Sequence, residues 1–332
     1  MRSVSDMCTA VTYKTKDHYF GRNLDLEYSY QETVTVTPRN YAFHFRKMGK
    51  ILSHYAIIGM AYVSKNYPLY YDAINEKGLC IAGLNFPENA GYKPYCDGKD
   101  NVTPFELIPW LLGQCATVVD AEKLIRTINL LDENFSDELP LSPLHWLISD
   151  KERSITLESV KSGIKIYENP VGILTNNPTF DYQLFNLNNY MQLTKGTPKN
   201  SFTNDENLEL EKYSRGMGAI GLPGDASSMS RFVKASFVKL NSVSSDSEEE
   251  SVSQFFHILK SVEMPRGCVE LAKDVYEITH YSSCCNIDRG IYYYTTYDNA
   301  QICAVDMYKE NLEGYELISY PLMKKQNIMY QN

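Results

Sequence analysis

The sequence has no long uninterrupted run of apolar residues and is poor in basic residues relative to acidic ones. No window reaches the roughly 18 consecutive apolar residues that cross a bilayer, so we expect no membrane partner. Lysine and arginine total 32 against 41 aspartate and glutamate residues, which gives a formal net charge of −9 at pH 7. Because such a chain repels phosphate backbones, we expect no nucleic-acid partner either.

The sequence also lacks the spacings of a zinc site. Its eight cysteines form no CxxC pair, there is no HExxH motif, and no two histidines stand four residues apart. We therefore expect no metal cofactor. The segment MRSVSD at positions 1–6 lacks the apolar centre of a signal peptide, which favours a cytoplasmic protein with reduced thiols.

Nucleotide-binding signatures are absent or out of context. The segment GMGAIG at 216–221 matches GxGxxG, but that pattern binds a pyrophosphate only between a strand and a helix. The preceding EKYSR is too polar for a buried strand, and Pro223 and Gly224 interrupt a helix. The sequence has neither the GxSxG elbow of a serine nucleophile nor the GxxxxGK[ST] loop that cradles phosphates.

The composition and the order of predicted elements indicate a folded α+β protein. The chain has 332 residues, of which 43% are hydrophobic and 22% charged, and no linker rich in proline, glycine or serine divides it. Helical patterns cover 103–115 and 120–131 and begin again near 227 and 250. The predicted strands, which share alternating or β-branched apolar residues, are 9–13, 33–37, 54–63, 78–86, 145–149, 155–160, 164–167, 276–284, 291–297 and 301–307. This order favours helix pairs stacked outside antiparallel sheets over a parallel doubly wound sheet.

A cysteine near the start of the chain, Cys8, follows Met7. Cysteine is a common small core residue, and core packing is one interpretation of Cys8. The other interpretation requires translation to begin at Met7 and that methionine to be removed, which leaves Cys8 with a thiol and a free α-amine. Since an α-amine has a pKa of about 8, it could act as the base for its own side chain.

Two charged residues, Arg22 and Asp25, stand in a strand-like stretch soon after Cys8. A hairpin would return them beside the cysteine, where a guanidinium favours the thiolate over the thiol. A structural ion pair at the end of a sheet is the alternative interpretation. These residues alone leave both interpretations open.

Several longer motifs occur in order along the chain. They are CTA at 8–10, GRNLD at 21–25, YDA at 71–73, NEKGL at 75–79, AGLNFP at 82–87, LTNNP at 174–178, GLPGD at 221–225 and SRF at 230–232. Together they resemble the choloylglycine hydrolase family, and the resemblance runs from Cys8 to near the C-terminus. It implies a four-layer αββα sandwich of N-terminal nucleophile hydrolase type, with antiparallel sheets, in a single domain over 8–332.

The resemblance also implies roles for individual residues. The residues expected to carry the chemistry are Cys8 as nucleophile, Arg22 and Asp25 beside it, Asn85 and Asn176 flanking the oxyanion, and Arg231 supporting the site. Asn176 is preferred to Asn177 because the family pattern is Asn, one residue, then Pro. For an apolar sterol pocket the candidate lining residues are Leu24, Phe135 and Leu139, with core or loop packing as the alternative for each.

The activity implied is hydrolysis of the amide bond of bile salts conjugated with glycine or taurine, with no metal or organic cofactor. Residues 1–7 would then be absent from the active chain, through initiation at Met7 and removal of Met7, or through autocatalytic removal of a leader. A penicillin V acylase of the same family is the alternative activity, although Asn85 favours the bile salt branch, where the other branch more often has Tyr. A non-catalytic small-molecule binding protein is the alternative if the N-terminus stays intact. We expect a homo-oligomer, either a dimer or a tetramer.

Overall fold

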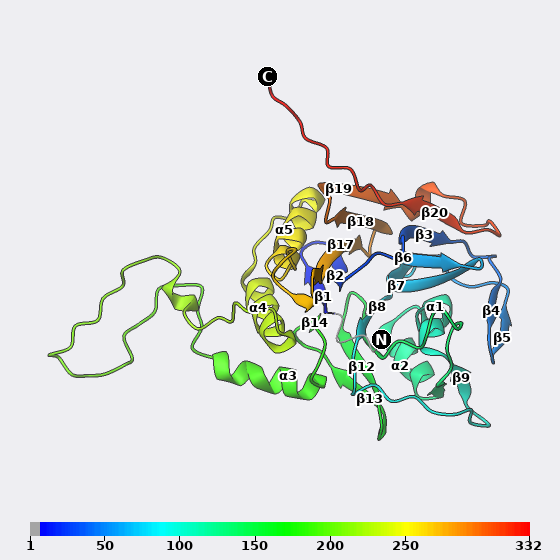
Figure 1. Cartoon of the computed structure of the whole chain (residues 1–332), viewed down its shortest axis with the longest axis horizontal. Coiled ribbons are helices and arrows are strands. Elements are labelled where there is room, and N and C mark those ends of the chain that lie inside the picture. Colours follow the sequence, from blue (N-terminus) through cyan, green and yellow to red (C-terminus); the bar gives the residue numbers. More distant parts are fainter. Residues whose placement is uncertain (1–6) are drawn as a thin grey trace.

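Two large antiparallel sheets lie against each other in the computed structural model, which describes residues 7–332 (Figure 1). The six-stranded sheet has the order β14-β1-β2-β17-β18-β19. Its strands are β14 (Ile173–Leu174), β1 (Cys8–Lys14), β2 (His18–Leu26), β17 (Ile278–Asn286), β18 (Ile291–Thr296) and β19 (Asn299–Asp306). The N-terminal hairpin therefore sits in the middle of a sheet that is completed by the C-terminal meander.

The eight-stranded sheet has the order β13-β12-β11-β8-β7-β6-β3-β20. Its strands are β13 (Gly163–Glu168), β12 (Ser154–Val160), β11 (Leu144–Ser149), β8 (Cys80–Asn85), β7 (Tyr67–Asn75), β6 (Ile57–Ser64), β3 (Thr33–Thr37) and β20 (Ile318–Pro321). Strand β8 contacts both β1 and β2, so the inner faces of the two sheets meet at the N-terminal hairpin.

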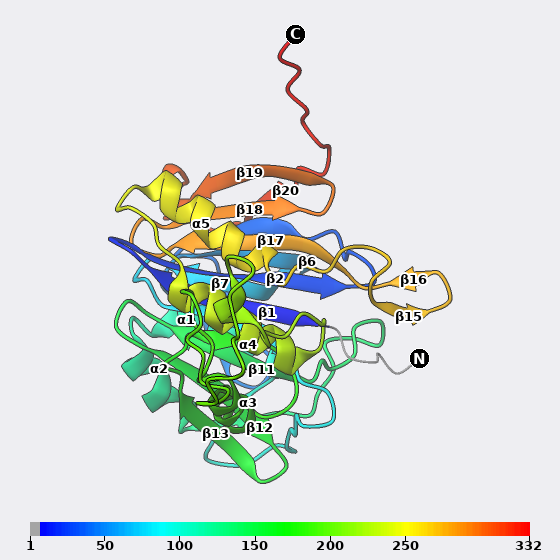
Figure 2. The same ribbon diagram turned by 90° about the vertical axis from the view of Figure 1, so that its left-hand side faces the viewer.

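Helices cover the outer face of each sheet. Helices α4 (Ser228–Asn241) and α5 (Glu248–Lys260) pack on the six-stranded sheet, where Figure 2 shows them crossing its strands. Helices α1 (Leu107–Gln114) and α2 (Val118–Ile125) lie on the other side, and α1 contacts β6, β7 and β8. The layers are thus helix, sheet, sheet, helix, which confirms the αββα sandwich expected from the sequence.

Buried apolar side chains form two clusters that follow these layers. One cluster fills the space between the sheets and under α4 and α5, and it includes Cys8, Phe20 and Phe255. The other lies between the eight-stranded sheet and α1 and α2, and it includes Trp110 and Trp146. Cys8 therefore belongs to the interior of the molecule and is 2% exposed.

The remaining elements are short. They are β4 (Phe43–Phe45) with β5 (Gly49–Ile51), β9 (Asp100–Val102) with β10 (Ile128–Leu130), β15 (Glu270–Ala272) with β16 (Val275–Tyr276), α3 (Phe180–Asn186), and the 3₁₀ turns Pro104–Glu106, Leu187–Tyr190, Met217–Ala219 and Met307–Lys309. Between the turn at 187–190 and α4 the chain makes a long excursion away from the body (Figure 1).

The helix predicted over 120–131 was placed wrongly. Helix α2 begins earlier, because Thr117 caps it by accepting a hydrogen bond from the backbone N–H of Asp120. It ends at Ile125, and 128–130 instead forms β10, parallel to β9. The amide of Asn129 donates to Asn101 Oδ1 at 2.8 Å across this pair. A non-local pairing therefore replaces the last turn that the apolar periodicity predicted.

Candidate active site

The β1–β2 hairpin brings Arg22 to Cys8. Cys8 is paired with Leu24, and Ala10 with Arg22, so Cys8 and Arg22 are diagonal neighbours on one face of the sheet. The guanidinium Nη2 lies 2.5 Å from Cys8 Sγ. The hairpin predicted from the sequence is confirmed, and it produces a thiol in direct contact with a buried cation.

The guanidinium of Arg22 is held on every side. Nη1 donates to the carbonyl oxygen of Tyr71 at 3.2 Å and to that of Gly83, and Nε donates to the carbonyl oxygen of Asn23 at 3.3 Å. Arg22 is 1% exposed. Although burial opposes its charge, Cys8 and nearby acidic groups hold the pKa of Arg22 above its usual range, so it stays a cation.

Asp25 lies near the end of β2 and is fully buried. Its Oδ1 accepts a hydrogen bond from Thr279 at 2.6 Å, whereas Oδ2 has no hydrogen-bond partner within residues 7–332. The backbone N–H of Asp25 donates to the carbonyl oxygen of Met7 at 3.1 Å. Burial raises the pKa of Asp25 to about 6, although Arg231 and the Thr279 hydroxyl both favour the carboxylate.

Asn176 follows β14 and joins three other candidate residues. Its Oδ1 accepts from the backbone N–H of Cys8 at 2.9 Å and from Arg231 Nη2 at 2.7 Å. Its Nδ2 donates to the carbonyl oxygen of Asn85 at 2.8 Å. By contrast, the side chain of Asn177 donates to the carbonyl oxygen of Pro87. Asn176 is therefore the asparagine of the pair that contacts Cys8.

Arg231, in the first turn of α4, spans from the helix to β1. Nη1 donates to the carbonyl oxygen of Cys8 at 2.5 Å and to Thr9 Oγ1 at 2.7 Å. Burial lowers the pKa of Arg231, while Asp25 and Cys8 oppose that change. Helix α4 thus fixes the backbone of the residue that carries the thiol.

The structure brings the six predicted catalytic residues together. Cys8, Arg22, Asn85, Asn176 and Arg231 are joined by the contacts above, and Asp25 lies beside them through its hydrogen bond to Met7.

Of the three predicted lining residues, Leu24 is buried opposite Cys8. Phe135 packs against Phe105 with ring centroids 5.1 Å apart, and Leu139 shares a turn with Ser136. The lining role of these three residues stays a prediction.

Sequence reasoning missed the polar residues behind the site. Asp72 accepts three hydroxyl hydrogen bonds at the core between the sheets, and Glu277 accepts the backbone N–H of Met7. Gln183 donates to the carbonyl oxygen of Asn176 at 2.5 Å. Asp72 gave a signal, since it is a lone acid in the otherwise apolar and aromatic run YYDAI, but nothing local indicated its partners.

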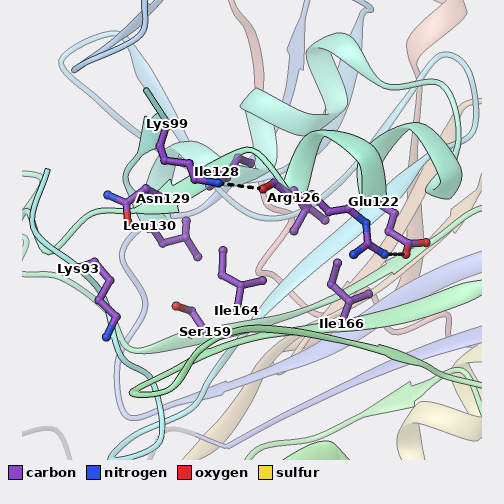
Figure 3. Close-up of a pocket in the computed structure, with 12 residues that line it drawn as sticks. Lys93, Lys99, Glu122, Arg126, Ile128, Asn129, Leu130, Ser159, Ile164 and Ile166 are labelled. Carbon is purple, nitrogen blue, oxygen red and sulfur yellow. Dashed lines mark hydrogen bonds and ion pairs between the residues drawn. The ribbon is translucent and has the colours of Figure 1, made fainter. Parts of the chain in front are cut away.

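A cavity of about 530 Å³ lies away from these residues, between α2 and β13 (Figure 3). Its lining includes Ile125, Arg126, Ile164 and Ile166, and none of the predicted site residues is among them. Within residues 7–332 there is no group of three or more His, Cys, Asp and Glu side chains placed to hold a metal ion. In the same part of the chain no helix combines the length and apolarity needed to span a membrane.

A family model described as linear amide C–N hydrolases, choloylglycine hydrolase family, matches residues 8–320. The chain is 61% identical over 316 residues to a protein named bile salt hydrolase/transferase from Lactiplantibacillus plantarum, covering 95% of this chain and 97% of that one. The structure is similar to that of a variant of conjugated bile acid hydrolase from Clostridium perfringens, with a TM-score of 0.89, 36% identity, and coverage of 98% and 100%.

A penicillin V acylase from Agrobacterium tumefaciens shares the fold, with a TM-score of 0.73 and 21% identity over 98% of this chain and 94% of that chain. The family match starts at the cysteine whose thiol contacts Arg22, and it runs through both sheets into β20. The chain belongs to the choloylglycine hydrolase family of linear amide C–N hydrolases.

Proposed function

We propose that this chain hydrolyses the amide bond of bile acids conjugated with glycine or taurine, and that Cys8 is the nucleophile. The observation that carries this proposal is the contact of Cys8 Sγ with the buried guanidinium of Arg22, at the first residue of β1. A cation at this distance stabilises a thiolate, which is the reactive form of cysteine. The names of the related proteins supply the class of amide.

The proposed active chain begins at Cys8, with residues 1–7 removed or untranslated. Removal of Met7 would convert the backbone N–H of Cys8, now bound to Asn176 Oδ1, into an α-amine. The same removal would leave the backbone N–H of Asp25 without its Met7 acceptor, in the residue whose buried Oδ2 has no hydrogen-bond partner within residues 7–332. An α-ammonium group fits there, since it supplies donors and a charge opposite to that of the carboxylate.

The proposed reaction has two stages. The Cys8 thiolate attacks the substrate carbonyl carbon, and the resulting oxyanion is stabilised by amide donors of Asn85 and Asn176. The C–N bond then breaks, and the departing glycine or taurine takes a proton from the α-ammonium group. In the second stage water, losing a proton to the α-amine, attacks the cholyl thioester and releases the free bile acid and the thiolate.

The lining residues remain part of the proposal. Leu24 lies on the face of the sheet that carries Cys8 and Arg22, so it is placed to contact an acyl group bound there. Phe135 forms an aromatic cluster with Phe105 and Tyr67, and Leu139 lies in the same loop. Replacement of Phe135 by Ala should raise KM for a conjugated bile salt more than it lowers kcat.

We also propose that the chain forms a dimer or tetramer in the cytoplasm, where a nucleophilic thiol stays reduced. The long excursion before α4 presents apolar side chains to solvent that a second copy would cover. These exposed residues are Met191, Phe202, Leu208, Leu210, Tyr213 and Ile220. Light scattering coupled to size-exclusion chromatography tests the assembly, and a monomer at micromolar concentration would contradict it.

The proposed function is tested by incubating the purified protein with glycocholate, taurocholate and penicillin V. The released glycine, taurine and 6-aminopenicillanic acid are quantified separately, with Cys8→Ser as the matched inactive control. Release of glycine or taurine that depends on Cys8 supports the proposal. Cleavage of penicillin V alone would refute the bile salt substrate and support an amidase that acts on penicillins. No cleavage of any of the three amides would refute the proposed activity.

A further inference from the structure

Asp72, on β7, is a fully buried acid held by three hydroxyl groups from the opposite sheet. Its Oδ1 accepts from Tyr281 at 2.6 Å, and its Oδ2 accepts from Tyr292 at 2.7 Å and from Ser283 at 3.0 Å. All three donors are themselves buried. Burial raises the pKa of Asp72, whereas the charge of Arg22 and the three hydroxyl donors oppose that change. A carboxyl group that accepts three hydrogen bonds and donates none in this set is suited to the ionised form.

Hydrogen bonds connect Asp72 and its donors to Arg22. The backbone N–H of Arg22 donates to Ser283 Oγ at 3.0 Å, and that oxygen in turn donates to Asp72. On the other side, Nη1 of Arg22 donates to the carbonyl oxygen of Tyr71, the residue next to Asp72. Asp72 is therefore tied both to the backbone and to the guanidinium end of Arg22, but through intermediates.

The charge of Arg22 needs this acid. The acceptors around its guanidinium are the carbonyl oxygens of Asn23, Tyr71 and Gly83, which carry no net charge, together with Cys8 Sγ. A buried cation without a counter-charge is strongly unfavourable. While Cys8 is a neutral thiol, the negative charge that balances Arg22 must therefore come from another acidic group. Burial lowers the pKa of Arg22, while Cys8, Tyr281 and then the carboxyl groups of Asp72 and Asp25 raise it. Asp72 and Asp25 are the two carboxyl groups in that set.

We propose that Asp72 is a positioning residue that balances the charge of Arg22 and thereby sets how readily Cys8 becomes a thiolate. This inference rests on the proposed role of Cys8 as nucleophile. Arg22 attracts the negative charge on Sγ, and the Asp72 carboxylate, from further away, opposes it. The Asp72 carboxylate stabilises the charge of Arg22 while Cys8 is an uncharged thiol. It also limits how far Arg22 stabilises the thiolate, since a thiolate that is too stable is a poor nucleophile.

Other titratable groups surround the pair and are unchanged in the test below. They are the proposed α-ammonium group of Cys8, Asp25 on β2, Tyr71 on β7, Arg231 on α4, Tyr281 and Cys285 on β17, Tyr292 on β18, and Glu277 between β16 and β17. Only the charge of Asp72 differs between the native chain and Asp72→Asn.

The test is the pH dependence of Cys8 alkylation by iodoacetamide in the full chain that begins at Cys8. The Cys8 peptide is followed by mass spectrometry, because other cysteines also react, and no bile salt is present. Asp72→Asn should lower the midpoint of the alkylation profile by at least about half a pH unit, since one opposing charge is removed. The limiting rate at high pH should fall by about 3-fold for each unit by which the midpoint falls.

Two control variants separate this role from a structural one. Asp72→Glu keeps the charge and should keep a midpoint close to the native one. Glu106→Gln removes a different buried acid, bound to Thr103 and Arg46 in the outer layer, and should leave the midpoint unchanged even if it lowers stability. A folded Asp72→Asn with an unchanged or raised midpoint would overturn the inference.

If Asp72→Asn does not fold, Tyr281→Phe and Tyr292→Phe take its place. Each removes one hydroxyl donor, so the carboxylate holds a proton to higher pH and opposes the thiolate less. Both should lower the alkylation midpoint by a smaller amount, and no change in either would overturn the inference. Since alkylation needs no substrate, failure to cleave bile salts would refute the proposed function without bearing on Asp72.

Discussion

The Nη2 of Arg22 lies 2.5 Å from the Sγ of Cys8, and both residues are almost completely buried. Two antiparallel strands joined by a short turn create this contact, because a residue and its diagonal partner share one face of a sheet. The arginine is fixed by three backbone carbonyls, so it does not need to reorganise as charge develops on sulfur. The proposed nucleophile is thus preorganised by a local hairpin.

Replacing the thiol should abolish turnover without unfolding the chain. Cys8→Ser should lower kcat/KM for a conjugated bile salt by at least about 1,000-fold, equivalent to about 4 kcal/mol, because an alcohol is a weak nucleophile near neutral pH. Steady-state kinetics and thermal melting measure the two effects. Cys284→Ser, which alters a buried thiol on β17, is the matched control and should retain turnover. Near-native turnover of Cys8→Ser would refute the assignment.

The active chain should begin at Cys8, because the proposed nucleophile and base belong to the same residue. In the structure the backbone nitrogen of Cys8 is an amide that donates to Asn176. An amide cannot accept the thiol proton, so a chain that retains Met7 should have no more than about 1% of the activity of the trimmed chain. Intact-mass measurement and N-terminal sequencing of active fractions test this. Full activity in protein that still begins at Met1 would exclude the α-amine as base.

Local patterns were sufficient for the elements that carry the nucleophile. The strand-like stretch after Cys8 suggested the hairpin that unites Cys8 and Arg22, and the helical pattern beginning near 250 predicted the helix that the structure shows as α5. In the structure Ser247 caps that helix by accepting the backbone N–H of Glu250. Such features depend on neighbours within a few residues, which is why sequence reasoning finds them.

Contacts between the two sheets could not be predicted from local sequence patterns. Asp72 binds Tyr281 and Tyr292, which are more than 200 positions away and belong to strands of the other sheet. No periodicity specifies which residues of two stacked sheets oppose each other, because that depends on strand order and register over the whole fold. Asn176 was selected from a motif, and its contacts with Cys8 and Arg231 required the structure.

Asp25 should make the stability of the untrimmed chain fall as the pH rises from about 4 to about 6. Burial raises its pKa to about 6, so in this window the folded chain keeps a proton that the unfolded chain releases. Asp25→Asn should therefore stabilise the chain that retains Met7 at pH 7.5, by up to about 3 kcal/mol, and have less effect at pH 4. Urea unfolding at the two pH values measures the difference.

Two comparisons sharpen this prediction. In the chain trimmed to Cys8, the proposed α-ammonium group would pair with Asp25, so Asp25→Asn should lose the stabilising effect. Asp225 should affect stability with the opposite pH dependence, because hydrogen bonds from Ser227 and Ser230 lower its pKa to about 2. Its contribution is present above about pH 4 and is lost as the pH falls toward 2, so Asp225→Asn should destabilise at neutral pH. Equal effects of Asp25→Asn at pH 4 and pH 7.5 would contradict the assigned pKa.

Asn85 should help to set the preference for bile salts over penicillin V. It ends β8 with 7% exposure, and its backbone carbonyl oxygen accepts from Asn176, so we expect its side-chain amide beside the proposed oxyanion site. The native chain should cleave glycocholate or taurocholate with a kcat/KM at least about 10-fold above that for penicillin V, or about 1.4 kcal/mol. A sterol offers more apolar surface than a phenoxyacetyl group, and its burial contributes about 25 cal/mol per Å² before ordering costs.

Asn85→Tyr should narrow the ratio of kcat/KM for the bile salt to kcat/KM for penicillin V, because it removes an amide donor and adds an aromatic ring at the site. Faster cleavage of penicillin V by the native chain would refute the bile salt preference and leave the amidase chemistry intact.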